Sequence, residues 1–134
     1  MRNSQGSGII TWGIFPMNNV SSDNSLRDAS DRRPSRLAGV QISAAAETLF
    51  GDLALPPDPH GVIVFAHGSG SSRFSRRNRA VAAELQARGF ATLLLDLLTP
   101  QEEPVDQITR EFRFDIPLLA GRLAAGARWV ASNP

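Results

Sequence analysis

The stretch "VIVFAHGSGSSR", Val62 to Arg73, decides the fold of this chain. Its first five residues are apolar without alternation, a pattern typical of a strand that is covered on both faces in a parallel sheet. The strand stops at His67, and a loop rich in glycine and serine follows. In open α/β sheets the ligand site lies beyond such strand ends. The stretch therefore predicts a buried central strand with a candidate site directly after it.

The residues after this loop predict a βαβ unit. From Ser75 the apolar residues recur at helical spacing, as Ala82 and Leu85 do, and Gly89 stands where a helix would end with positive φ. A second apolar strand follows over 90–98, "FATLLLDLL". A strand, a helix and a strand within such a length give two parallel strands joined by a right-handed crossover.

The flanking segments add two strands and one helix. "VQIS" and "TLFGDLALPP" predict an antiparallel pair that begins at Val40 and is closed by prolines. "TPQEEPVDQ" is interpreted as an acidic loop, and a helix is expected to begin at Asp115, with Pro117 in its first turn. Its predicted buried stripe is Ile116, Leu119, Leu123, Ala127 and Val130. The predicted fold class is thus α/β over 40–134, with antiparallel first strands, then a parallel βαβ unit and a further helix.

Residues 1–39 have neither the helical nor the strand period over a useful length and are rich in Ser, Asn, Asp and Arg. Such a segment buries too little apolar surface to offset the entropy of ordering it. We therefore expect it to be disordered. Either Met1 or Met17 could be the natural start.

Composition narrows the function classes. The chain has no cysteine and only two histidines, so we expect no metal site and no cofactor, and a cytoplasmic location is compatible. All 14 basic residues are arginine, but the formal net charge is only +1. We therefore interpret the local arginine cluster at 73–79 as a solvated helix face and expect no binding of nucleic acid. No apolar run is long enough to span a membrane.

The loop after His67 is suited to hold negative charge on an oxygen. Gly68 and Gly70 let backbone N–H groups approach a ligand, and the helix that follows adds the positive end of its dipole. One candidate chemistry is phosphate binding, although the third glycine of G-x-G-x-x-G is missing. The other is an oxyanion hole for acyl transfer. A non-enzymatic anion-binding module that uses this loop and the arginine cluster is the alternative to an enzyme.

The run "AHGSGSSR…RN…LLLDLLTP" resembles α/β-hydrolases related to dienelactone hydrolase, from about Val40 to the end of the chain. The resemblance implies a hydrolase of carboxylic esters or lactones, with a small-molecule substrate and a serine nucleophile. It also implies that the Ser69 amide is the oxyanion donor, beside His67 and Gly68, and that Asp96 is a structural residue at the end of its strand. Gly70 and Arg73 would then be candidate substrate contacts, and Arg73 and Asn78 would tie the loop to the helix.

The departures from that family pattern matter as much as the match. No G-x-S-x-G occurs, and His67 precedes the place where a nucleophile would come, so we interpret it as an anchor of the loop and not as the catalytic base. We expect the chain to be an amino-terminal part, inactive alone, whose complete form carries a missing half or a fused domain such as the phosphoribosyltransferase domain of some relatives. Its strand 62–66 would then be a bare apolar sheet edge that is prone to aggregation.

Overall fold

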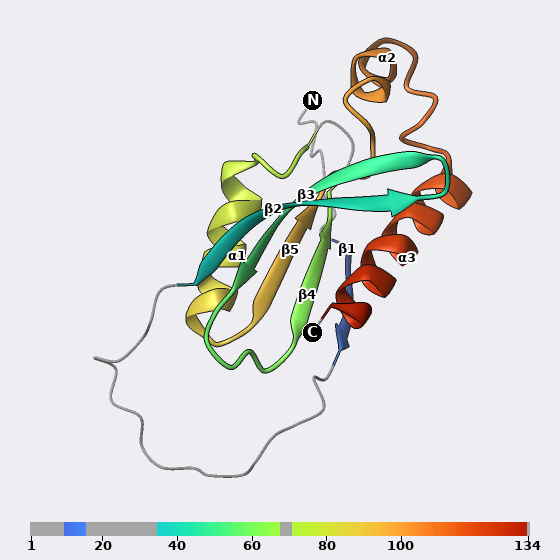
Figure 1. Cartoon of the computed structure of the whole chain (residues 1–134). Helices are drawn as coiled ribbons and strands as arrows, with labels where there is room; N and C mark the ends of the chain where they lie inside the picture. The colour runs from blue at the N-terminus through green and yellow to red at the C-terminus, as the bar shows by residue number, and fades with distance from the viewer. Residues whose placement is uncertain (1–9, 16–34, 68–70, 134) are drawn as a thin grey trace, which may run out of the picture.

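The computed structural model describes residues 10–15, 35–67 and 71–133, which form a sheet flanked by helices (Figure 1). Along the chain the elements are the strands β1 (Ile10–Phe15), β2 (Arg36–Ala44), β3 (Glu47–Leu55) and β4 (Val62–Ala66), the helix α1 (Arg76–Ala87), the strand β5 (Ala91–Leu95), and the helices α2 (Glu102–Thr109) and α3 (Ile116–Ser132).

The predicted antiparallel pair is present as the hairpin β2–β3, whose register runs from Arg36 opposite Leu55 to Ala44 opposite Glu47. Two residues connect the strands, and the first of them, Ala45, has a φ of 55°. Strand β2 begins four residues before the predicted start at Val40, because pairing with β3 continues back to Arg36.

The βαβ unit is also confirmed. Strands β4 and β5 pair in parallel with Val62 opposite Ala91, and every residue of both strands is buried. Between them α1 begins at the N-cap Ser75, whose side chain accepts a hydrogen bond from the backbone N–H of Asn78, and Gly89 follows its end with a φ of 85°. The chain therefore folds as α/β, as the sequence predicts.

The sheet order is β1-β4-β5-β3-β2, so β4 is not an edge strand. Strand β1 pairs antiparallel with β4, with Ile10 opposite Ala66. The prediction of a bare edge at 62–66 is therefore wrong, and so is the prediction of disorder for Ile10–Phe15 and for 36–39. The outer edge of β4 has backbone N–H and C=O groups that need hydrogen-bond partners. Strand β1 supplies these partners, and the pairing with β4 orders β1 in turn. Residues 1–9 and 16–34 of the predicted disordered segment lie outside the described residues.

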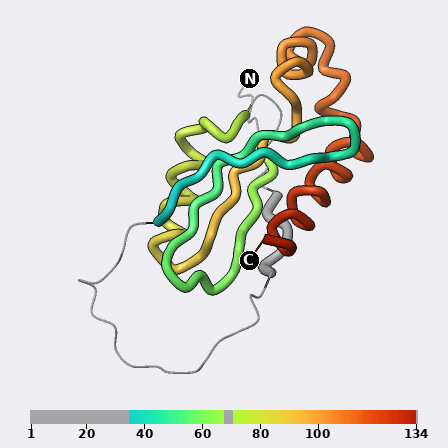
Figure 2. Tube along the Cα trace, viewed as in Figure 1, coloured from blue at the N-terminus to red at the C-terminus, as the bar shows by residue number. Residues whose placement is uncertain are grey.

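Helices cover both faces of the sheet, and the trace in Figure 2 follows the same arrangement. Because side chains alternate along a strand, Val62 and Val64 of β4 join the core under α3, whereas Ile63 and Phe65 join the core under α1. This layering explains why β4 lacks polar residues. In the part of the chain that the structure describes, no helix has both the length and the apolar character needed for crossing a bilayer.

The last third of the chain differs from expectation in two details. The acidic segment is not only a loop, because it contains the helix α2. Helix α3 does begin after the N-cap Asp115, but its buried face consists of Arg122, Ala125, Gly126 and Val130, whereas Ile116 is 65% exposed. Of the predicted stripe, Val130 is buried and Leu123 packs against the core, while the small residue Gly126 lets α3 lie close to Leu95 of β5.

Candidate functional site

A cavity of about 510 Å³ lies beyond the carboxyl ends of β4 and β5. Its wall includes His67, which follows β4, and Asp96, which follows β5. Phe50 of β3 and Leu119 of α3 also contribute, together with residues of α2. Parallel strands place their carboxyl ends at one edge of a sheet, and this geometry brings the two segments together.

Asn78 holds His67 from the first turn of α1. The side-chain nitrogen Nδ2 of Asn78 lies 2.7 Å from His67 Nδ1 and donates to Ser71 Oγ at 3.3 Å. Asn78 is only 8% exposed, and both contacts are partly buried. The three residues thus connect the end of β4, the returning loop and the helix. Asn78 links His67 and Ser71 to α1 through its side chain.

Burial of the ring lowers the pKa of His67 below its ordinary value, and the nearby carboxylate of Asp96 offsets part of this change. The imidazole is therefore neutral at pH 7. A neutral ring that is already engaged at Nδ1 is consistent with an anchor of the loop. Within the described residues, no acid holds the ring as the third member of a catalytic triad would.

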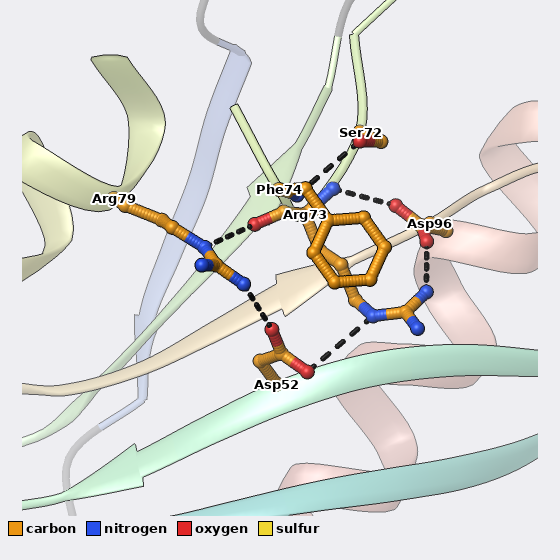
Figure 3. A network of polar contacts seen from close by, with 6 residues as sticks. All are labelled: Asp52, Ser72, Arg73, Phe74, Arg79 and Asp96. Carbon is orange, nitrogen blue, oxygen red and sulfur yellow. Dashed lines mark hydrogen bonds and ion pairs between the residues drawn. The ribbon is translucent and has the colours of Figure 1, made fainter. Parts of the chain in front are cut away.

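Arg73 is fastened to the sheet by two carboxylates (Figure 3). Its backbone N–H donates to Asp96 Oδ1 at 2.7 Å, and its guanidinium forms an ion pair with Asp96 Oδ2. Its Nε lies 3.4 Å from Asp52 Oδ1, while the guanidinium also lies over the ring of Phe74, 4.3 Å from its centre. These contacts fix Arg73, which follows the loop, against the middle of β3 and the carboxyl end of β5.

The same contacts decide what the arginine cluster can do. Arg79 donates to Asp52 and to the backbone oxygen of Arg73, so both guanidiniums are already engaged by protein groups. Arg73 lines the cavity, but its charge is compensated by Asp96 and Asp52. This pairing does not favour the hypothesis of an anion-binding module, because a phosphate would have to compete with two carboxylates.

Gly68, Ser69 and Gly70 lie outside the described residues, so the predicted oxyanion donor stays a prediction. What the structure does place is both ends of that segment, His67 and Ser71, at the cavity. In the described part of the chain, no three acidic or histidine side chains gather as a metal site would require.

Sequence reasoning missed the two ion pairs that shape the α2 side of the cavity. The carboxylate of Asp106, 2% exposed, accepts hydrogen bonds from the backbone N–H groups of Phe112 and Arg113 and from Arg113 Nε. Arg122 donates to both carboxylate oxygens of Glu102 and to the backbone oxygen of Leu97. The local signals were the i to i+7 spacing of Asp106 and Arg113 and the T-x-x-E pattern of Thr99 and Glu102, whose side chains and backbone N–H groups hydrogen-bond each other.

The architecture and the comparisons together define the class: the chain has an α/β-hydrolase fold over most of its length. More particularly, this fold is similar to that of a dienelactone hydrolase. It is similar to the crystal structure of dienelactone hydrolase from Anabaena variabilis, with 49% identity and a TM-score of 0.73 over 76% of this chain and 47% of that one.

Two curated relatives from Mycobacterium tuberculosis, of strains CDC 1551 and H37Rv, carry the name of a phosphoribosyl transferase. Each is 50% identical over 107 residues, which is 80% of this chain and 23% of the relative. The chain thus spans about a quarter of their length. No family model matches the chain.

Proposed function

We propose that this chain contributes the oxyanion side of an α/β-hydrolase that cleaves carboxylic esters or lactones through a serine nucleophile. The observation that supports the proposal best is the way both ends of the segment 68–70 are held beside the cavity. His67 is bound by Asn78 at one end, and Arg73 is bound by Asp96 at the other. A loop with fixed ends can present its amides without reorganising during the reaction.

The chemistry follows from acyl transfer. A serine hydroxyl supplied by the rest of the protein gives its proton to a base there, its oxygen attacks the substrate carbonyl carbon, and the electron pair of the carbonyl bond moves to the carbonyl oxygen. Backbone N–H groups of the loop, with that of Ser69 as the proposed donor, stabilise the resulting alkoxide by about 3 kcal/mol for each donor. The alkoxide then collapses and expels the alcohol, which takes the proton back from that base. Water attacks the remaining acyl-serine in the same way, releases the carboxylic acid and restores the serine hydroxyl.

The phosphoribosyl transferase name of the mycobacterial relatives is compatible with this proposal. This chain covers 23% of each of them, so the activity in the name can belong to another part of those proteins. The dienelactone hydrolase has nearly the same sequence identity to this chain and a comparable fold over 76% of it. A hydrolase is therefore the function that the described residues support best.

The test uses two proteins and a set of p-nitrophenyl esters and small lactones. The first is the 134-residue chain, which we expect to be inactive because it contains no G-x-S-x-G. The second is a chimera in which the chain is continued by the remaining part of the Anabaena hydrolase. We expect the chimera to hydrolyse esters and to lose this activity on treatment with a sulfonyl fluoride. A folded chimera without hydrolysis, under conditions in which the Anabaena enzyme is active, would refute the proposal.

A further inference from the structure

The faces on which the helices pack locate a place for one further strand in the sheet. Helix α1 packs on the face that carries Ile63 and Phe65 of β4, and α3 packs on the face that carries Val62 and Val64. The two helices therefore lie on opposite sides of the sheet (Figure 1). The crossover from β4 through α1 leads to β5, which is the neighbour of β4 on one side.

The handedness of crossovers fixes where a strand after α3 would lie. A right-handed crossover adds the next parallel strand in one direction along the sheet, and this direction reverses when the connecting helix lies on the other face. A chain that continues from α3 into a parallel strand must therefore step back from β5 towards β4. The position next to β5 is already taken by β4, so the strand reaches the outer edge of β4. This edge is the place where β1 lies.

Strand β1 holds this edge through a short and irregular antiparallel pairing. Its register with β4 shifts between Trp12 and Phe15, whereas β4 and β5 pair without interruption along the whole of both strands. In the sheet that the structure describes, β1 is the last strand and pairs with β4 alone. Residues 16–35 separate β1 from β2 along the chain. Strand β1 can therefore leave the edge without breaking any other strand pair.

The burial of β4 indicates which kind of strand fits beside it. Every residue of β4 is buried, because helices cover both faces of the sheet at this point. A parallel strand in such a position is a nearly continuous apolar run. The similar Anabaena hydrolase has the length to supply one, since this chain matches only 47% of it.

We propose that the outer edge of β4 is the binding site for an apolar parallel strand from the remaining part of the complete hydrolase, and that β1 occupies this site until that strand displaces it. The inference goes beyond the proposed reaction, because it concerns the assembly of the sheet and none of its tests requires hydrolysis. While β1 is bound, it satisfies the backbone groups of β4 and protects the edge from pairing with other chains.

Hydrogen exchange followed by mass spectrometry tests the displacement. In the 134-residue chain the backbone amides of Ile10–Phe15 should be protected through their pairing with β4. In the chimera described above this protection should be lost, and the first strand after α3 should be protected instead. The hairpin β2–β3 is the internal control and should stay protected in both proteins. A folded chimera in which β1 remains protected would overturn the proposal.

A reversible cross-link tests whether the two strands compete. Trp12 and Val64 lie opposite each other, within the reach of a disulfide, and this chain has no cysteine. In a chimera free of other cysteines, oxidised Trp12→Cys/Val64→Cys should leave the added strand unprotected, and reduction should restore its protection. The matched control joins Ser43→Cys to Thr48→Cys across the β2–β3 hairpin and should leave the added strand protected in both states. Protection of the added strand beside a cross-linked β1 would contradict competition for one edge.

A binding measurement decides the question if the chimera does not fold. The remaining part of the Anabaena hydrolase, as a separate polypeptide, is titrated by calorimetry into the 134-residue chain and into a chain that lacks residues 1–34. The shortened chain should bind it more tightly, because β1 no longer competes for β4. The ratio of the two Kd values should equal the inverse of the fraction of 134-residue molecules in which the edge is free. Equal affinities, or binding by neither chain, would refute the proposal.

Discussion

Two glycines of α3 should respond in opposite ways to the same substitution. A Cβ at Gly126 would lie 2.5 Å from Leu95 Cδ2, whereas a Cβ at Gly121 would meet nothing within 4 Å. Leu95 is fully buried in β5, so its side chain has little room to move. Gly126→Ala should therefore force the helix or the strand to shift, and Gly121→Ala should not.

The magnitude follows from two contributions. Replacing glycine by alanine inside a helix stabilises the helix by about 1 kcal/mol, and this contribution is common to both variants. Overpacking at Gly126 costs about 1–3 kcal/mol more. The free energies of unfolding of the two variants should therefore differ by about 1–3 kcal/mol. Gly121→Ala should be more stable than the parent, and Gly126→Ala should be less stable than Gly121→Ala.

Urea titration followed by circular dichroism measures this difference directly, and thermal melting should show it as a Tm gap of several degrees. The parent protein is the common reference, and equal m-values ensure that the variants unfold from comparable states. If Gly126→Ala were as stable as Gly121→Ala, α3 could not lie against β5 as closely as described, and the placement of Leu119 in the cavity wall would be in doubt.

Three other predictions concern the sheet edge and the ion pairs. Deleting residues 1–34 removes β1, so β4 should become an open edge and the protein should self-associate at micromolar concentration in light scattering; a monomer would contradict this. Glu102→Gln leaves the cation of Arg122 buried without its partner and should cost about 3 kcal/mol at pH 7. The hydrogen bond from Arg122 lowers the pKa of Glu102, so the stability that this ion pair contributes is complete above the ordinary glutamate pKa and is lost as pH falls through the lowered pKa of Glu102. Urea titrations should therefore show the free energies of unfolding of the variant and the parent converging in acid. Arg73→Leu should cost about 2 kcal/mol and speed amide exchange at 71–74, whereas unchanged exchange would refute its role in holding the loop.

The βαβ unit was predictable because each of its signals is local. The apolar run of β4 reports burial on both faces, Ser75 caps α1, and Gly89 ends the turn after it with positive φ. The N-cap Asp115 was predictable for the same reason, since its side chain accepts from the backbone N–H of Leu118 three residues on. Such signals need no knowledge of the rest of the fold.

Helix α2 was missed because its composition is typical of a loop. Pro104 is the third residue of the helix, where its missing N–H costs nothing, and the acidic side chains of Glu102 and Glu103 lie in the first turn. Both features favour a helix start, because the N-terminal end of a helix dipole attracts negative charge. The buried face of α3 was misplaced because Arg122, a charged residue, is buried in it through its pair with Glu102.

The contacts that build the candidate site could not be predicted from spacing. Arg73 and Asp96 are 23 residues apart, and Asn78 and His67 are 11 apart, so no helical or strand period relates them. They meet because parallel pairing places the ends of β4 and β5 side by side while α1 begins above them. The sequence could therefore propose the loop as a candidate site, but the hydrogen bond between Asn78 and His67 and the pairing of Arg73 with Asp96 depend on that convergence.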